Sequence, residues 1–173
     1  KEIEIGDQDR LNGIEVARLA GVEIPHYCWH PGLSVVASCR MCLVETGKRD
    51  AKTGQIQMTG KLSPACQTPA TDGTVFVTNS DKVKAARAMV EEDLLIDHPI
   101  DCPICDKAGE CNLQDYYFEH GQPKRRADLQ PFTSRKRPMG ETVMLFVDRC
   151  VMSSRCVRFT REISGSAELQ VMT

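Results

Sequence analysis

The sequence predicts an α+β protein made of small cysteine-rich modules, and three observations lead to this prediction. Short segments that alternate charged and apolar residues stand beside segments with helical periodicity, so both strands and helices are expected. The nine cysteines occur in tight groups, which favours bound metal over disulfides. Aromatic residues make up only 5% of the 173 residues and charged residues 27%, and the resulting thin core needs a metal or disulfide staple.

Composition also narrows the classes of function. A net charge of −2 gives no general attraction to nucleic acid. The sequence has no signal peptide and no apolar run of roughly 18 residues, the length that a membrane helix needs. A reducing, cytosolic setting is therefore expected. The sequence begins at Lys1 without an initiator methionine and stops at Thr173 without a closing element, so we expect a fragment of a longer protein.

The first residues predict a strand followed by a helix. Residues 1–5 alternate charged and apolar side chains, the period-two signal of a half-buried strand. Asn12 then begins a short helix, because Glu15 three residues later completes a capping-box pattern. Gly21 is well placed as the C-terminal cap of this helix.

A first group of cysteines has the spacing Cys-x10-Cys-x2-Cys-x23-Cys, formed by Cys28, Cys39, Cys42 and Cys66. Structural zinc sites typically use two Cys-x2-4-Cys knuckles, and only one knuckle is present here. Thiols from separate loops suit a [2Fe–2S] cluster of the plant-type class, and a zinc site is the alternative. His26 and His30 are interpreted as solvated loop histidines, because four thiols already complete the site.

Strands and a long helix are predicted around and after these cysteines. The strands are expected at 41–46, 55–62 and 74–78, the last one introduced by an Asp-Gly turn. A helix is expected to begin after Asn79 or Ser80 and to end near Ile96, with an apolar stripe at helical spacing.

This helix leads into a second motif, HPIDCPICDKAGEC, with the spacing His-x3-Cys-x2-Cys-x5-Cys. Thiolates are soft ligands that select zinc, copper(I) or iron–sulfur clusters. The Cys-x2-Cys step lets two thiolates reach one centre from a single turn. A histidine just ahead of three clustered cysteines is a better candidate for a ligand than an isolated one. The candidate ligands are His98, Cys102, Cys105 and Cys111.

The last third of the chain contains an incomplete third motif. A short helix is expected at 113–119, a basic linker at 123–138 and a strand at 141–148. Cys150 and Cys156 follow, with Ser153 where a cysteine would complete Cys-x2-Cys-x2-Cys, the opening of a [4Fe–4S] binding run. No later cysteine exists in this sequence, so we expect the third site to be empty in this chain.

Three segments carry a family resemblance: PHYCWHPGLSVVASCRMCLVE, LLIDHPIDCPICDKAGECNLQDYY and MLFVDRCVMSSRCVRFTREISG. They resemble the N-terminal iron–sulfur region of the large peripheral-arm subunit of respiratory complex I, which is the G subunit in bacteria and the 75 kDa subunit in mitochondria. The resemblance implies a β-grasp [2Fe–2S] ferredoxin domain at 1–79 that lacks its first strand. At 80–122 it implies a small helical module whose [4Fe–4S] cluster has one histidine and three cysteine ligands. After the linker, it implies an incomplete bacterial-ferredoxin-like [4Fe–4S] module at 139–173.

The resemblance also implies a function. Cys28, Cys39, Cys42 and Cys66 would hold the [2Fe–2S] cluster, and His98 with Cys102, Cys105 and Cys111 the [4Fe–4S] cluster. Only Cys150 and Cys156 match the ligands of a second [4Fe–4S] cluster. The chain would be an electron-relay module of NADH-quinone oxidoreductase, passing electrons from a flavin- and NADH-binding partner subunit towards quinone.

This expected module would bind other peripheral-arm subunits of a multi-subunit complex, on the cytoplasmic face of the inner membrane. The chain has no phosphate-binding Gly-rich loop and no candidate acid–base pair, so no complete substrate site and no catalytic residue is predicted. The iron–sulfur relay region of an NAD-linked hydrogenase or formate dehydrogenase is the alternative within this class. A zinc-stabilised interaction protein is the alternative outside it.

Overall fold

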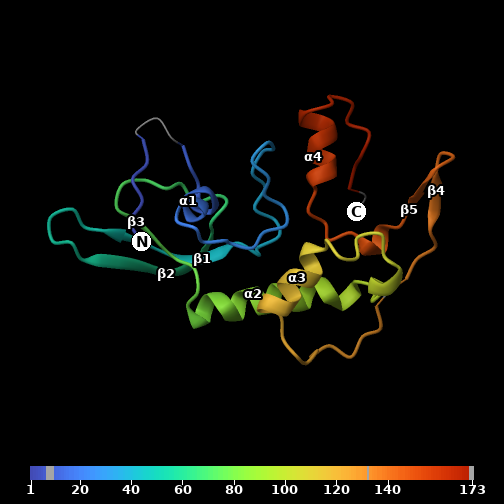
Figure 1. Ribbon diagram of the computed structural model, residues 1–173, viewed down its shortest axis with the longest axis horizontal. Helices are drawn as coiled ribbons and strands as arrows, with labels where there is room; N and C mark the ends of the chain where they lie inside the picture. The colour runs from blue at the N-terminus through green and yellow to red at the C-terminus, as the bar shows by residue number, and fades with distance from the viewer. Residues whose placement is uncertain (7–9, 132, 172–173) are drawn as a thin grey trace. The chain divides into compact units, whose positions relative to one another are not determined.

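The computed structural model describes residues 1–6, 10–131 and 133–171, which form a mixed set of helices and small antiparallel sheets (Figure 1). This confirms the expected α+β class. The chain divides into two compact units. The first unit consists of Lys1–Arg87 together with Ser153–Thr173, and the second of Ala88–Met152.

Helix α1, Gly13–Leu19, begins at the predicted capping box. The Asn12 side chain accepts hydrogen bonds from the amides of Ile14, at 3.0 Å, and Glu15, at 3.1 Å. The Glu15 carboxylate in turn accepts from the Asn12 amide at 2.8 Å. Three of the amides that a helix start leaves unpaired are thereby satisfied. Gly21, just beyond the C-terminal end, has a φ of +69°, as expected of a glycine that follows a helix.

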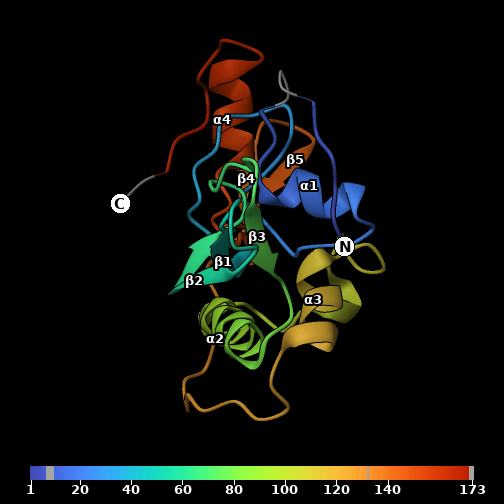
Figure 2. The same ribbon diagram turned by 90° about the vertical axis from the view of Figure 1, so that its left-hand side faces the viewer.

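A three-stranded antiparallel sheet has the order β2-β1-β3. Its strands are β1, Leu43–Arg49, β2, Ile56–Pro64, and β3, Thr74–Val77. All three predicted strands are confirmed, with ends shifted by up to three residues. In Figures 1 and 2, α1 lies on one side of this sheet and the start of α2, Asp81–Asp97, on the other. The predicted cap of α2 is also confirmed, because the Ser80 hydroxyl accepts from the Val83 amide at 3.3 Å.

The hydrophobic core of the first unit surrounds α1 and the cysteine-bearing end of the sheet. Its buried members are Ile14, Ala17, Ile24, Trp29, Ala37, Cys42, Val44, Ala65 and Cys66. Gly13 lies where α1 approaches this end most closely: a Cβ there would be 2.8 Å from Phe76 Cε1 and 3.1 Å from Ala65 Cβ. The Gly13 amide donates to the carbonyl oxygen of Ala65 at 2.9 Å. A glycine is therefore needed for the helix to pack against the segment that carries Cys66.

The strand predicted at residues 1–5 is wrong, because residues 1–6 form no β-ladder. Ile3 and Ile5 are nonetheless half-buried, so the alternation indicated burial correctly. The segment is held by side chains instead: Glu2 pairs with Arg49, and Lys1 Nζ donates to the Ala20 carbonyl. A strand requires a partner for its backbone groups, which alternation does not reveal.

The second unit contains most of α2 and a set of short elements. These are η1, Cys102–Ile104, α3, Asn112–His120, β4, Arg137–Met139, β5, Val143–Leu145, and η2, Val147–Arg149. The predicted helix at 113–119 is confirmed by α3. The strand predicted at 141–148 is shorter, and it pairs with β4, which overlaps the last two residues of the predicted linker at 123–138. The turn of this hairpin includes Gly140 at a φ of +76°.

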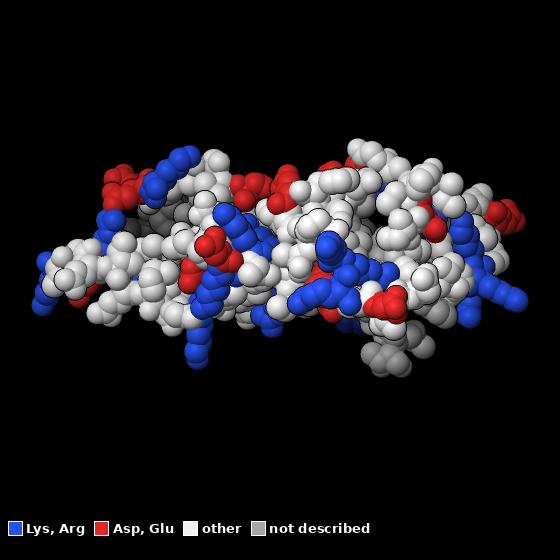
Figure 3. All heavy atoms as spheres, turned by 90° about the horizontal axis from the view of Figure 1, so that it is seen from below, with Lys and Arg blue, Asp and Glu red and all other residues white. Residues whose placement is uncertain are grey.

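Helix α4, Arg155–Glu162, belongs to the first unit and was not predicted. The predicted modules stay a prediction; they are 1–79, 80–122, 123–138 and 139–173. The two compact units are defined by contacts between residues, whereas the predicted modules are defined by the cluster that each would bind. In Figure 3, lysine and arginine side chains are interspersed with acidic ones over the face shown. Within the described residues, no helix is both long and apolar enough to cross a membrane.

Candidate metal centres

Two thiols of the first centre lie at one end of the three-stranded sheet. Leu43 of β1 is paired with Pro64 of β2, and the Ala65 amide donates to the Cys42 carbonyl at 3.0 Å. Cys42 therefore directly precedes β1 where Cys66 follows β2. Antiparallel pairing thus brings together two thiols that are separated by 23 residues of sequence. Both cysteines are only 1% exposed.

The other two thiols of this centre come from the loop between α1 and β1. Cys28 is 1% exposed and Cys39 is half-buried. Ala37 and Arg40, on either side of Cys39, have φ values of +50° and +59°. Residues other than glycine rarely adopt this left-handed conformation, and surrounding contacts must hold them in it. The loop is thus bent tightly around Cys39.

Hydrogen bonds join the four thiols in a row: Cys39 with Cys28, Cys28 with Cys66, and Cys66 with Cys42. Cys39 and Cys66 donate to Cys28, which holds the pKa of Cys28 well below the usual thiol value. The same interactions raise the pKa of Cys39 and of Cys66. A hydrogen bond with Cys66 lowers the pKa of Cys42 to about 7. The site therefore favours negative charge on the sulfurs of Cys28 and Cys42, and the thiolate is the form in which cysteine binds metal.

Backbone amides add to this preference. Those of Tyr27, Cys28 and Met41 donate to the Cys39 sulfur, and those of Ala65 and Cys66 to the Cys42 sulfur. Amide donors around sulfur ligands stabilise negative charge and tune reduction potential in iron–sulfur proteins. All four cysteines are free of disulfides, three are fully buried, and two of these, Cys42 and Cys66, belong to the hydrophobic core. This donor set fits a [2Fe–2S] cluster, which takes four cysteine ligands.

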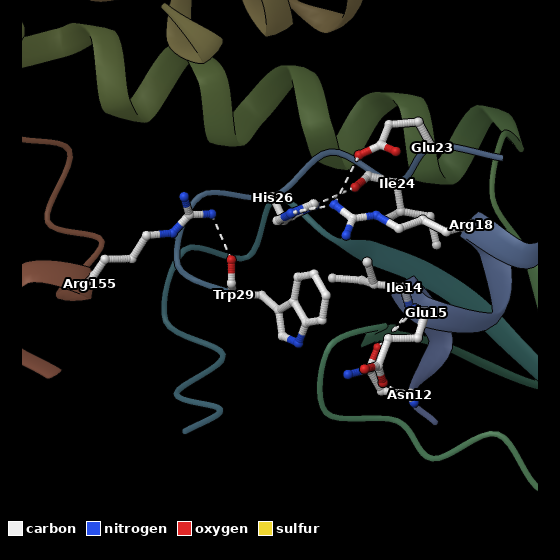
Figure 4. A network of polar contacts seen from close by, with 9 residues as sticks. All are labelled: Asn12, Ile14, Glu15, Arg18, Glu23, Ile24, His26, Trp29 and Arg155. Carbon is white, nitrogen blue, oxygen red and sulfur yellow. Dashed lines mark hydrogen bonds and ion pairs between the residues drawn. The ribbon is translucent and has the colours of Figure 1, made fainter. Parts of the chain in front are cut away.

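A polar network links α1 to the residues that precede Cys28 (Figure 4). His26 Nδ1 lies 2.7 Å from the Ile24 carbonyl oxygen, and Nε2 lies 3.4 Å from Arg18 Nη2. These partners assign a neutral ring that donates at Nδ1 and accepts at Nε2. Burial lowers the pKa of His26. The interpretation of His26 as a solvated histidine is thus wrong, since it is only 7% exposed, whereas His30 is exposed as expected.

Trp29 anchors this network to the core. Its indole contacts the His26 ring edge-on, with centroids 5.1 Å apart, and the Arg18 guanidinium lies 5.0 Å from its centroid. Arg155 of α4 donates to the Trp29 carbonyl at 2.6 Å (Figure 4). The next turn of α4 supplies Arg158, whose guanidinium reaches the carbonyls of Cys28 and Ser34. Neither arginine was predicted from the sequence, because their three-residue spacing is equally typical of a solvated helix face.

The second centre is built from one local segment. His98 directly follows α2, Cys102 begins η1 with Pro103 in its first turn, and Cys111 is the N-cap residue of α3. The Cys105 amide donates to the Cys102 carbonyl at 3.4 Å, so these two cysteines share one turn. Gly109 has a φ of +84°, which allows the chain to turn back before Cys111.

A cavity of about 420 Å³ adjoins this segment. His98, Cys102 and Cys111 line it together with apolar side chains that include Leu95, Ile100, Leu113, Tyr117 and Phe118. The fourth ligand candidate, Cys105, lies in the same turn as Cys102. Two of the three aromatic residues of α3 border the cavity.

The charge state of His98 suits a metal ligand. Burial first, and then the nearby Arg149, lower the pKa of His98, so the imidazole is held neutral. A neutral imidazole is the form that coordinates metal. Arg149 pairs with Asp101 at 3.1 Å and lies 4.6 Å from the Phe146 ring centroid. A histidine and two thiols that line a mostly apolar cavity, with a third thiol in the adjoining turn, fit an iron–sulfur cluster with mixed ligands.

The third motif does not fit a four-ligand cluster. Cys150 and Cys156 are exposed, and they belong to different compact units. The Met152 amide donates to the Cys150 sulfur at 3.3 Å, and the Ser153 hydroxyl accepts from the Arg155 amide at 3.5 Å. Only two thiols are available. In the described part of the chain, no group of three His, Cys, Asp or Glu side chains is gathered closely enough to hold a single metal ion.

Two family models match the stretches of sequence that contain the first two candidate centres. A family model described as a 2Fe-2S iron-sulfur cluster binding domain matches residues 14–81, which contain the four cysteines of the first centre. A model of the NADH-ubiquinone oxidoreductase-G iron-sulfur binding region matches residues 87–126, which contain His98 and the three cysteines of the second centre. Both matches end before Cys150.

A solved structure is also similar. It is a chain of the NAD⁺-reducing [NiFe]-hydrogenase in the H2-reduced state, with a TM-score of 0.79 and 29% identity. The match covers 94% of this chain and 64% of the hydrogenase chain.

Relatives that match most of this chain are subunits of NADH-quinone or NADH-ubiquinone oxidoreductase. The G subunit of NADH-quinone oxidoreductase from Rickettsia conorii is 38% identical over 97% of this chain, and that from Pseudomonas fluorescens is 35% identical over 99%. The mitochondrial 78 kDa subunit of NADH-ubiquinone oxidoreductase from Candida albicans is 37% identical over 90%. The chain spans 23%, 18% and 20% of these relatives, respectively. It is therefore a homologue of the G subunit of NADH-quinone oxidoreductase and carries that family's iron–sulfur binding sequences.

Proposed function

We propose that this chain is an iron–sulfur electron-relay module of NADH-quinone oxidoreductase. Electrons would enter from a flavin-bearing, NADH-oxidising partner subunit and leave towards quinone. The observation that carries the proposal is the convergence of four thiols, three of them fully buried, within a chain whose relatives are subunits of this oxidoreductase. Burial keeps water from the metal ligands, and the amide donors favour the charge that the ligands carry.

The geometry of the two centres supports a ligand assignment. Cys28, Cys39, Cys42 and Cys66 would hold a [2Fe–2S] cluster in a β-grasp ferredoxin domain. His98, Cys102, Cys105 and Cys111 would hold a [4Fe–4S] cluster. Each bound cluster would accept and release one electron at a time, while the protein holds it in place. Cys150 and Cys156 would leave a second [4Fe–4S] site incomplete, since two thiols do not provide four ligands.

The partners follow from the same proposal. The module would bind the flavin- and NADH-binding subunit and other peripheral-arm subunits, and would reach quinone only indirectly. Its place would be the cytoplasmic face of the inner membrane, to which the complex attaches it. The mixed surface charge in Figure 3 suits docking to several protein neighbours better than binding to a polyanion.

Anaerobic reconstitution followed by iron and sulfide assay tests the cluster content. One two-iron and one four-iron cluster give about six irons per chain. EPR of the reduced protein should show two signals with different relaxation behaviour. About ten irons would contradict the incomplete third site, and fewer than two would contradict the proposal as a whole.

A second candidate function has a specific observation in its favour, namely the similarity to the NAD⁺-reducing hydrogenase chain. The same clusters would then relay electrons between a nickel–iron subunit and an NAD-binding subunit. Purification of the native complex distinguishes the two. NADH-dependent quinone reduction by the complex supports the first proposal, and hydrogen-dependent NAD⁺ reduction supports the second.

A zinc-stabilised interaction protein remains the alternative of a different class. Zinc–thiolate sites are colourless, because zinc has a filled d shell, whereas iron–sulfur clusters absorb visible light. A colourless, zinc-loaded protein after anaerobic purification from iron-replete cells would favour this alternative and exclude electron transfer.

A further inference from the structure

Arg158 is a buried cation placed directly against the loop that carries the first cysteine ligand. It lies on α4 and is 7% exposed, although arginine is among the residue types least often buried. Its guanidinium donates to Ser34 O at 2.5 Å and also to the carbonyl oxygen of Cys28. Two further bonds, to Ser153 O at 3.3 Å and to Ser154 Oγ at 3.2 Å, tie it to the segment that begins α4.

We propose that Arg158 is a positioning residue for the first metal centre, which fixes the loop at 28–34 and raises the reduction potential of the cluster bound there. This inference rests on the proposed function, because it assumes a [2Fe–2S] cluster at Cys28, Cys39, Cys42 and Cys66.

The positioning part follows from the shape of the guanidinium. A planar fork with fixed donor directions can hold several carbonyls at once, which a lysine cannot do. Here the fork joins residues 28 and 34, the two ends of a loop that contains no helix or strand. Glu162, one turn further along α4, accepts from the Ser34 amide at 2.8 Å and also bonds the Ser34 hydroxyl. Two side chains of one helix therefore define where this loop runs.

The electrostatic part follows from the type of acceptors. The four oxygens bound by Arg158 are uncharged, so these bonds do not neutralise its charge. The Glu162 carboxylate lies close enough for the arginine charge to contribute to the lowered pKa of Glu162, but it is itself fully exposed and screened by solvent. A positive charge beside a cluster ligand stabilises the reduced cluster, which carries one more negative charge. The cation should therefore raise the potential.

Arg161 provides a matched control. It has the same charge, lies on the same helix and is exposed. Arg158→Gln and Arg161→Gln thus remove the same charge from buried and solvated positions, respectively. Arg158→Lys keeps the charge but loses the fork, which separates positioning from electrostatics.

The experiment is a redox titration of the reconstituted chain, followed by EPR of the two-iron signal, with hydrogen–deuterium exchange at residues 28–34. We expect Arg158→Gln to lower the midpoint potential, with the reduction equilibrium changed by about tenfold, which is ~59 mV for a one-electron couple. Arg161→Gln should change it much less. Arg158→Lys should lower the potential less than Arg158→Gln and should speed exchange at 28–34, whereas Arg161→Lys should do neither.

The outcomes separate this inference from the proposed function. If the unmodified chain gives no two-iron signal, the proposed function fails and this inference fails with it. If the signal is present but Arg158→Gln titrates like Arg161→Gln, only the inference is overturned. If Arg158→Gln does not assemble a cluster, the exchange rate and midpoint potential of Arg158→Lys test the inference instead. Exchange and potential equal to those of Arg161→Lys would then overturn the inference, and faster exchange with a lowered potential would support it.

Discussion

The two candidate metal centres are built in opposite ways. The first draws its four thiols from residues 28 to 66 and places three of them at 1% exposure, where a loop meets the ends of β1 and β2. The second draws all its ligand candidates from residues 98 to 111, with Cys102 exposed and no strand involved. The first centre is therefore a product of tertiary structure, and the second of a local sequence motif. Loss of long-range packing should damage the first more than the second.

The largest effect is expected when one thiol is removed from the end of the sheet, because this should destroy the first centre and leave the second intact. Cys66→Ala should abolish the two-iron EPR signal entirely and leave the signal of the second centre, since three cysteines cannot complete the four-ligand set. The measurement is EPR with iron and sulfide assay on the reconstituted protein. Cys150→Ala, which removes an exposed thiol outside both centres, is the control and should preserve both signals. An unchanged spectrum of Cys66→Ala would refute the ligand assignment.

A change at His98 alters the second centre without removing it. Replacing a neutral imidazole by a thiolate adds negative charge beside the cluster, so His98→Cys should lower the reduction potential of that cluster. Only the sign is predicted, because ligand reach and hydrogen bonding change as well. The first centre in the same sample is the internal control and should titrate as before. A potential that stays constant or rises would count against His98 as a ligand.

Packing at the first centre can be tested at Gly13. An added Cβ would lie 2.8 Å from the Phe76 ring, so Gly13→Ala should lower the free energy of unfolding by about 1–3 kcal/mol. Gly32→Ala is the control, because the atom nearest to its added Cβ would be His30 Nδ1, at 3.4 Å. Chemical denaturation of both variants measures the difference. Equal stability of the two would show that α1 does not pack closely against the Cys66 segment.

The smallest effect is expected at Gly109, where a substitution should weaken the second centre and leave the first unchanged. Gly109 has a φ of +84° and open space around its Cα, so Gly109→Ala adds backbone strain alone, about 1 kcal/mol. This should hasten loss of the second cluster on dilution into chelator, while the first is retained. Gly109→Asn should have a smaller effect, since asparagine tolerates left-handed conformations better than alanine. Loss of the first cluster at the same rate would contradict the separation of the two centres.

Much of the local structure was determined by the sequence itself. The capping box of Asn12 and Glu15, the three strands and the cap of α2 at Ser80 all follow from short-range rules, and the structure confirms each of them. The grouping of the second centre was predictable for the same reason. His98 and Cys111 are so close in sequence that a helix end and one turn bring them to the same cavity.

The tertiary structure alone decided what depends on distant partners. Residues 1–5 alternate like a strand but find no ladder, because their sequence does not specify a partner edge. Cys66 joins Cys42 through the register of β1 and β2, which spacing suggests but cannot define. Arg158, about 130 residues from Cys28, reaches its carbonyl only because α4 packs against the ferredoxin-like part of the chain. Short-range hydrogen bonding is encoded in neighbouring residues, whereas long-range contacts are selected by the packing of the whole unit.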